Sequence, residues 1–349
     1  MKTEYFLVDK DHPDQQALQS AAELLKQGKL VAFPTETVYG LGANGLDAAA
    51  VARIFQAKGR PTDNPLILHI ANQQELNQLV IEVPVNAQVL IDEYWPGPLT
   101  VVLKRSAMIP DIISGGLDTV AIRLPASKVA RQLIALAGMP IAAPSANTSG
   151  RPSPTSAQAV LADLNGRIDA IIDAGICDIG VESTVIDCTT PVPTLLRPGG
   201  ITLEMLINTL GEIEIDPALG GSTECVPRSP GMKYTHYAPI APMKLFEGTY
   251  PRIADLMLQE IRAAIDAGQK VGAIISAETA QRLPAAVVAA VYGSRQQPSE
   301  IAANLYTALR SFDDKAVDVI FAEGIAEQGL GLAIMNRLRK ASGYQIIKS

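Results

Sequence analysis

Two cations that could bind phosphate, Lys58 and Arg60, follow a helix that we expect to be capped by Asp47 and to run to about residue 57. A cation pair in this place can also be a solvated helix end that favours the helix dipole. The segment 145–150 (Ser-Ala-Asn-Thr-Ser-Gly) offers hydroxyls and successive backbone N–H groups, as anion-binding loops do. The same segment can also be an ordinary capped turn. Neither the cation pair nor this segment therefore identifies the chemistry alone.

Polar residues also mark several expected strands. Arg123 lies in 119–124, which otherwise reads as a buried strand, so its guanidinium needs a carboxylate partner or a ligand. The triplet 182–184 (Glu-Ser-Thr) opens another strand, and Arg197 closes a third. Hydroxyl and cationic groups at several strand ends predict one cleft for a nucleotide and a small acid.

The stretch 33–70 is expected to organise this cleft. The apolar residues 30–33 read as a buried strand, and Pro34 should end its pairing. The polar residues 35–37 follow, and the glycines of 40–45 predict a turn. The chain then returns as a strand over 65–70. Short connections therefore bring two strand ends and the cationic helix end together.

The spacing Gly40-x-Gly42-x-x-Gly45 also matches the glycine pattern of dinucleotide-binding proteins. Such a site requires its first glycine directly after an apolar strand and an acidic residue about twenty positions later. Here a polar run precedes the glycines, and the cations of 58–60 occupy the later position. The residues on both sides of the glycines therefore disfavour a nicotinamide site.

The composition excludes several classes of protein. The chain has 349 residues, 48% of them hydrophobic, which indicates two folded domains, and its net charge of -7 disfavours a broad nucleic-acid surface. Cys177, Cys188 and Cys225 show no Cys-x-x-Cys spacing, so we expect reduced cysteines in a cytoplasmic protein. No apolar run approaches the roughly 18 residues of a membrane span.

Periodicity predicts the domain organisation. Residues 1–210 mix strands and helices without strict alternation, which favours a twisted mixed sheet flanked by helices. Residues 211–242 read as a linker without regular structure, although 229–239 is rich in aromatic and basic side chains. Residues 243–349 alternate strand and helix, which predicts a small Rossmann-like parallel α/β domain. The glycines at 329 and 331 precede its last helix and favour a helix cap over an anion site.

Several motifs resemble a known family. The chain carries PTETVYGLG, AKGRPxxNPLIxHI, AIRLP, APSANxSGxPSPT, ESTVID and LLRPGG, in this order. Together they resemble the YrdC-like domain of the threonylcarbamoyl-AMP synthases, and SPGMKYxHYAP followed by an α/β domain resembles their long, two-domain form. The resemblance implies that L-threonine, bicarbonate and ATP form threonylcarbamoyl-AMP and pyrophosphate, for threonylcarbamoyladenosine in tRNA. It also implies a downstream threonylcarbamoyl-transfer complex as the partner that receives the product.

The resemblance also assigns residues. The tetrad that marks the family stands here as Lys58, Arg60, Ser145 and Asn147 and is expected to act in catalysis. The residues implied to bind ATP are Lys58, Arg60, Thr62, Thr119, Ser145, Asn147, Ser153, Arg197, Tyr234 and His236. Those implied to bind threonine are Thr35, His69, Arg123, Ala143 through its backbone, and Ser183. Mg²⁺ is expected to be bridged by the ATP phosphates, with no side-chain ligands.

Some alternatives stay open at this point. His69 can be a satisfied strand histidine, and the aromatic residues of the linker can join the two domains where the resemblance implies a lid over the cleft. A double-stranded RNA-binding module and a sensor of threonine or nucleotide are alternative functions. A carbamoyl-transfer domain of the hydrogenase-maturation type is a third, but it is expected to carry Cys-x-x-Cys motifs, which this chain lacks.

Overall fold

The computed structural model describes residues 2–220 and 237–349. The chain divides into two compact units, and each is described here by itself. The first lies within Met1–Ser149, Ser153–Asp178 and Glu182–Lys233. The second consists of Gly150–Pro152, Ile179–Val181 and the chain from Tyr234 onward.

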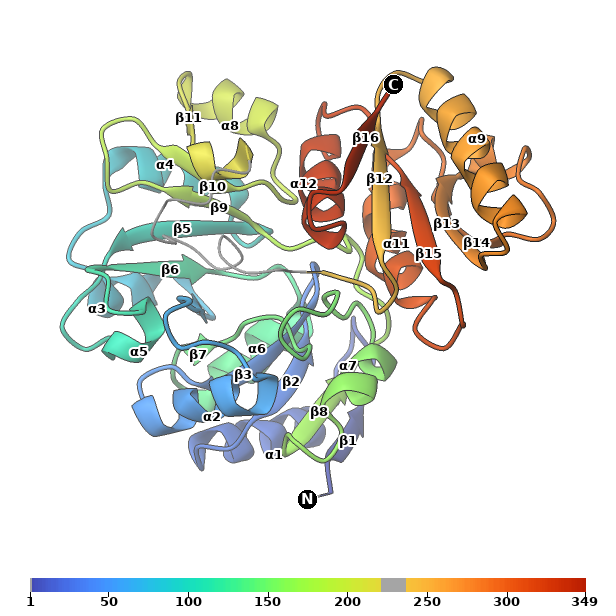
Figure 1. Ribbon diagram of the computed structural model, residues 1–349. Coiled ribbons are helices and arrows are strands. Elements are labelled where there is room, and N and C mark those ends of the chain that lie inside the picture. Colours follow the sequence, from blue (N-terminus) through green and yellow to red (C-terminus); the bar gives the residue numbers. More distant parts are fainter. Residues whose placement is uncertain (1, 221–236) are drawn as a thin grey trace. The chain divides into compact units, whose positions relative to one another are not determined.

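The first unit is built on one mixed sheet of eleven strands in the order β1-β8-β2-β3-β7-β4-β6-β5-β9-β10-β11 (Figure 1). In chain order its strands are β1 (Glu4–Leu7), β2 (Val31–Pro34), β3 (Tyr39–Asn44), β4 (Ile67–His69), β5 (Leu99–Lys104), β6 (Thr119–Arg123), β7 (Ile141–Ala142), β8 (Ala170–Asp173), β9 (Thr184–Asp187), β10 (Thr194–Arg197) and β11 (Glu214–Ile215). Parallel and antiparallel pairs alternate irregularly along it. The expected mixed sheet is confirmed.

Helices of the first unit connect these strands. They are α1 (Gln15–Lys26), α2 (Ala48–Lys58), α3 (Leu76–Leu79), α4 (Val85–Tyr94), α5 (Asp111–Ser114), α6 (Lys128–Ala137), α7 (Ala157–Leu164) and α8 (Leu203–Leu210), with 3₁₀ turns η1 (Gln73–Glu75) and η2 (Pro217–Gly220). The Asp47 side chain accepts from the backbone N–H of Ala49 and Ala50, as its sequence position predicts. Gly59 ends α2 with φ at 62°, a left-handed conformation that glycine adopts without strain.

The largest difference from the sequence prediction is β3. Gly40 and Gly42 were expected in a turn, but both belong to this strand, which pairs antiparallel with β2 and, at its far end, with β7. Their small size serves packing. A Cβ on Gly42 would lie 2.9 Å from the Phe33 ring and 2.9 Å from Ile141. Pro34 likewise continues the pairing at the end of β2, opposite Tyr39.

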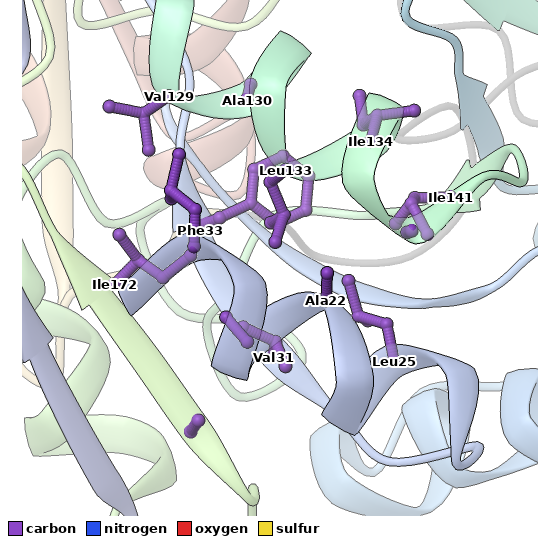
Figure 2. Packing of buried hydrophobic residues seen from close by; sticks show 14 of the residues in the cluster. Ala22, Leu25, Val31, Phe33, Val129, Ala130, Leu133, Ile134, Ile141 and Ile172 are labelled. Atoms are coloured by element: carbon purple, nitrogen blue, oxygen red, sulfur yellow. The ribbon is translucent and has the colours of Figure 1, made fainter. Parts of the chain in front are cut away.

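One hydrophobic core of the first unit lies between α1, α6 and the strands β2, β7 and β8. Figure 2 shows Leu25 of α1 and Leu133 of α6 gathered with Val31 and Phe33 of β2 and with Ile172 of β8. All are fully buried. Burial of each such side chain contributes roughly 1.5–3 kcal/mol, so this cluster fixes the strand that leads into the polar residues 35–37.

Two further features of the first unit bear on the site. Helix α4 ends before Trp95, whose indole N–H donates to the carbonyl of Leu99 at 2.7 Å and ties the helix to β5. The range 211–220 was expected to be irregular, but it contains β11 and η2. Strand β11 pairs with β10 in parallel, a contact too short to leave a periodic signal in the sequence.

The second unit carries a five-stranded sheet in the order β14-β13-β15-β12-β16, and all its strand pairs are parallel. Its elements are β12 (Met243–Glu247), α9 (Arg252–Asp266), β13 (Val271–Ser276), α10 (Ala277–Ala280), β14 (Val288–Gly293), α11 (Pro298–Arg310), β15 (Val319–Glu323), α12 (Gly331–Ala341) and β16 (Ile346–Lys348). Figure 1 shows β12 and β15 side by side. The expected parallel α/β domain is confirmed, with α10 and β16 as elements that periodicity did not reveal.

Two short segments of the second unit, 150–152 and 179–181, are held by α11 and by the residues that follow it. Arg310 donates to the carbonyl of Pro152 through Nε, at 3.1 Å, and through Nη2. Arg151 pairs with Asp313. A Cβ on Gly180 would lie 2.4 Å from the carbonyl oxygen of Ala302, so this position accepts glycine alone. Through the described ranges of both units, no helix is long and apolar enough to cross a membrane.

Candidate active site

Four of the predicted site residues fall along one edge of the first sheet. His69 and Arg123 end the parallel strands β4 and β6 and stand opposite one another. Ser183 directly precedes β9, whose start pairs with the start of β5 beside Arg123. Arg197 ends β10, opposite Val185. The sheet order therefore gathers these side chains from segments that lie far apart in the sequence.

Arg123 is buried and its partners are defined. Its Nη2 lies 2.5 Å from Oε1 of Glu36, and its Nη1 donates to the hydroxyl of Thr37 at 2.9 Å. Its Nε donates to the carbonyl of Gly97 at 3.3 Å. The expected carboxylate partner is thus Glu36. The bond also shows that the sheet curls, because the turn after β2 reaches the end of β6 across three intervening strands.

His69 is buried beside Arg123, with its ring edge-on to Phe33. Burial, and then the positive charge of Arg123, lower the pKa of His69 to about 3, so the imidazole is neutral at physiological pH. Its Nδ1 is buried and has no hydrogen-bond partner among the residues that the structure describes. An unpaired buried nitrogen is unfavourable, which disfavours the satisfied strand histidine and favours a ligand contact.

Ser183 and Arg197 form a second pair at this edge. Arg197 donates through Nε to the Ser183 carbonyl and through Nη2 to the Ser183 hydroxyl, both at 3.1 Å. The same hydroxyl lies 2.7 Å from the hydroxyl of Thr100. The backbone here is packed against Gly199, where a Cβ would lie 2.3 Å from the Glu182 carbonyl oxygen. The position of Ser183 is therefore fixed from two sides.

Lys58, Ser145 and Asn147 meet at the end of α2. The buried Lys58 ammonium donates to the carbonyls of Ser145 and Asn147, each at 2.5 Å. The Ser145 hydroxyl lies 2.5 Å from Oδ1 of Asn147, and the Lys58 carbonyl accepts from the N–H of Ser149. Three of the four residues in the predicted tetrad are thus brought together. Lys58 shapes the loop as well as supplying charge.

Arg60 lies beyond the left-handed turn at Gly59. Its Nη2 donates to the carbonyl of Pro65 at 3.1 Å and, more weakly, to that of Asn64 at 3.4 Å. The side chain is half-buried, and Thr62 in the same turn is exposed. These contacts hold Arg60 on the segment that leads into β4.

The remaining predicted residues have separate places. The Ser153 hydroxyl donates to Oε1 of Glu182 at 2.5 Å, and the N–H of Ala143 donates to the carbonyl of Ile67 at 3.0 Å. Thr35 is buried, and its hydroxyl donates to the carbonyl of Val38 at 2.7 Å. Thr119 begins β6, four residues before Arg123, which separates the two by about 13 Å of strand.

Sequence reasoning missed the roles of three residues. Glu36 and Thr37 were noted as polar residues after a strand, but their bond to Arg123 was not foreseen. Thr100 is a buried polar residue among the apolar residues 99–103 of β5, which is the signal that could have revealed it. Tyr234 and His236 lie outside the described residues. Within the described ranges, no group of three His, Cys, Asp or Glu side chains is placed to hold a metal ion.

Comparisons with known proteins bear on these observations. Residues 23–199 match a family model described as "Telomere recombination", and residues 201–343 match "Threonylcarbamoyl-AMP synthase, C-terminal domain". A curated protein of Pyrococcus abyssi named threonylcarbamoyl-AMP synthase is 53% identical over 95% of this chain and 95% of its own length. The chain belongs to the threonylcarbamoyl-AMP synthase family.

Two further comparisons extend over nearly the whole length. A Bacillus subtilis protein of the same name is 49% identical over 100% of both chains. A solved structure described as P. abyssi Sua5 complexed with L-threonine has a TM-score of 0.95 and 50% identity, and covers 99% of this chain and 100% of that one. Both the family and the fold expected from the motifs are therefore confirmed.

Proposed function

We propose that this protein is an L-threonylcarbamoyladenylate synthase, a nucleotidyltransferase that makes threonylcarbamoyl-AMP and pyrophosphate from L-threonine, bicarbonate and ATP. The observation that carries the proposal is the pair of His69 and Arg123 at the edge of the sheet. A buried guanidinium suits a carboxylate, and a buried neutral imidazole with an unpaired nitrogen suits a hydroxyl. L-Threonine carries both groups, and the related P. abyssi structure is described as complexed with it.

Threonine binds and forms the carbamate at the edge of the sheet that carries Arg123, His69 and Ser183. Arg123 holds the threonine carboxylate, and His69 and Ser183 lie at the same edge for its hydroxyl and amine. The neutral amine attacks the carbon of bicarbonate or CO₂ and gives a carbamate, with loss of a proton and, from bicarbonate, of hydroxide. The site binds and orients the reactants, and orientation alone contributes a large share of such rate enhancements.

The nucleotide side follows from Lys58, Arg60 and the loop of Ser145 and Asn147. A carbamate oxygen attacks the α-phosphorus of ATP in line, a P–O bond forms to the carbamate, and the bond to pyrophosphate breaks. The cations offset the charge that spreads over the phosphate oxygens. Mg²⁺, which prefers oxygen ligands, would accompany ATP and would offset charge on its phosphates. The product then passes to a threonylcarbamoyl-transfer complex that acts on tRNA. We place the protein in the cytoplasm, where ATP and tRNA are available.

Pyrophosphate release from ATP tests this proposal. Release should require L-threonine and bicarbonate together, and Lys58→Ala should abolish it. Lys26→Ala is the matched control, because Lys26 also ends a helix but is exposed, and its variant should keep full activity. Release that needs neither co-substrate would contradict the synthase. Binding of ATP and threonine without release would favour the sensor, and tight RNA binding without ATP would favour the RNA-binding alternative.

A further inference from the structure

Glu36 holds the guanidinium of Arg123, and its two carboxylate oxygens have different partners. Oε1 lies 2.5 Å from Nη2 of Arg123. Oε2 accepts from the backbone N–H of Ala126 at 3.1 Å and of Ser127 at 3.3 Å. Every one of these contacts uses Glu36 as an acceptor, so the position requires a group that only accepts hydrogen bonds.

The second set of partners anchors Glu36 to a rigid element. Ser127 caps the N-terminus of α6, and its hydroxyl also donates to the carbonyl of Pro34 at 3.3 Å. A carboxylate at a helix N-terminus is stabilised by the helix dipole and by the N–H groups there. The turn after β2 is thus fixed to the start of α6 at Pro34 and at Glu36, and Glu36 passes that fixed position on to Arg123.

The pair is buried, with 4% of the Arg123 side chain and 10% of the Glu36 side chain exposed. Burial alone raises the pKa of Glu36, but the charge and the hydrogen bond of Arg123 outweigh it, so the pKa is lowered and Glu36 is ionised. A buried ion pair is weak evidence of a stabilising role, because desolvation offsets much of its attraction. Its place beside His69 indicates a role in the site.

Arg123 keeps donors for a ligand. A guanidinium has five N–H groups. Gly97, Thr37 and Glu36 use one on each nitrogen, and among the described residues no further partner takes the second N–H of Nη1 and of Nη2. Two N–H groups are what a bidentate carboxylate needs.

We propose that Glu36 is a positioning residue that fixes the Arg123 guanidinium in the orientation that binds the carboxylate of threonine. The inference rests on the proposed function, because it takes threonine as the ligand. Glu36 could act in the opposite sense, as a carboxylate that competes with the substrate for Arg123. The two roles differ in sign: removal of a positioning residue weakens threonine binding, whereas removal of a competitor tightens it.

Two substitutions separate these roles. In Glu36→Gln, either orientation of the amide turns an NH₂ group toward a donor, on Arg123 or on α6, so one anchor is lost. Glu36→Asp keeps the charge but is one methylene too short to hold both anchors. The matched control is Glu75→Gln, because Oε1 of Glu75 accepts from the N–H groups of Ala71 and Asn72 at the start of another helical segment.

Calorimetric titration of the full-length protein with L-threonine, L-threoninamide and ATP tests the proposal. Threoninamide lacks the carboxylate, so it measures binding that does not depend on Arg123. Both Glu36 variants should bind threonine about tenfold more weakly, the loss of one charge-assisted hydrogen bond. Their affinities for threoninamide and ATP should change by at most about twofold. Glu75→Gln should bind all three compounds like the wild type.

The outcomes distinguish this inference from the proposed function. If the wild type binds threonine no better than threoninamide, the proposed role of Arg123 fails. If the wild type prefers threonine and both variants keep or increase that preference, Glu36 is no positioning residue, although the synthase stands. If ATP and threonine affinities fall equally in both variants, Glu36 acts on the fold as a whole, and the proposal is overturned.

Discussion

His69 and Arg123 occupy the same register position on neighbouring parallel strands, β4 and β6. A charged guanidinium and a neutral imidazole therefore lie side by side. Arg123 is paired with Glu36, while burial and the charge of Arg123 together lower the pKa of His69 to about 3. This edge of the sheet therefore offers a ligand one cation, which suits a carboxylate, and one neutral imidazole, which suits a hydroxyl.

Acidification should destabilise the fold through His69. Its folded pKa of about 3 lies below the unfolded value of 6.5, so the unfolded state binds a proton that the folded state does not. The free energy of unfolding should therefore fall as the pH drops from 6.5 toward 3, by up to about 1.4 kcal/mol per pH unit. Urea denaturation followed by circular dichroism between pH 6.5 and 4.5 measures this slope.

The control for that slope is His12, which is exposed. His69→Gln should reduce the pH dependence above pH 4.5, where most carboxylates are still ionised, and His12→Gln should leave it unchanged. Equal slopes in His69→Gln and the wild type would show that His69 takes up a proton in the folded protein as readily as in the unfolded chain.

Gly199→Ala should displace the strand start that carries Ser183. The added Cβ would lie 2.4 Å from the Ser183 carbonyl carbon and 2.4 Å from the Thr184 nitrogen, distances that force the backbone to move. We expect a loss of about 1–3 kcal/mol in unfolding free energy and a raised KM for threonine. Chemical denaturation and pyrophosphate release give the two values.

Gly138→Ala is the comparison for that substitution. Gly138 ends α6 with φ at +69°, and a Cβ there would meet open space. Its replacement should cost about 1 kcal/mol through backbone strain, without any change in KM. A normal KM in Gly199→Ala would mean that the start of β9 adapts without moving Ser183.

Arg197→Lys should impair the reaction although it keeps the charge. Arg197 binds the carbonyl and the hydroxyl of Ser183 with two different nitrogens, and a lysine has one. We expect kcat/KM for threonine to fall about tenfold, the equivalent of one lost hydrogen bond in the site. Arg105→Lys is the control, because Arg105 also donates to carbonyls, those of Leu117 and Ile109, in another part of the first unit. If both variants have wild-type kcat/KM, the second hydrogen bond of Arg197 has no role in catalysis.

Local signals in the sequence predicted the elements that local contacts make. Asp47 caps α2 through N–H groups two and three residues away, and both this helix and its cap were expected. Strand β3 was misread because its glycines resemble a turn. What requires Gly42 is the closeness of Phe33 and Ile141 on the two neighbouring strands, which local sequence patterns do not show.

The site shows the same limit. The burial of Arg123 predicted a carboxylate partner, but its identity depended on a contact 87 residues away in the sequence. Lys58 was predicted as a phosphate ligand, and its bonds to loop carbonyls became visible only in three dimensions. The motifs indicated the family of the chain and its site residues. The order and the curl of the sheet explain why the side chains of those residues lie close together.

Trp95 gives the molecule a built-in optical probe. It is the only tryptophan of the chain, it lies in the first unit, and its buried indole is held by the carbonyl of Leu99. Two residues later, the carbonyl of Gly97 binds Arg123. Its emission therefore reports the melting of the sheet that carries the site, separately from the second unit, whose aromatic residues are tyrosine and phenylalanine. A spectral shift on addition of an amino acid would register events at Arg123 without any attached dye.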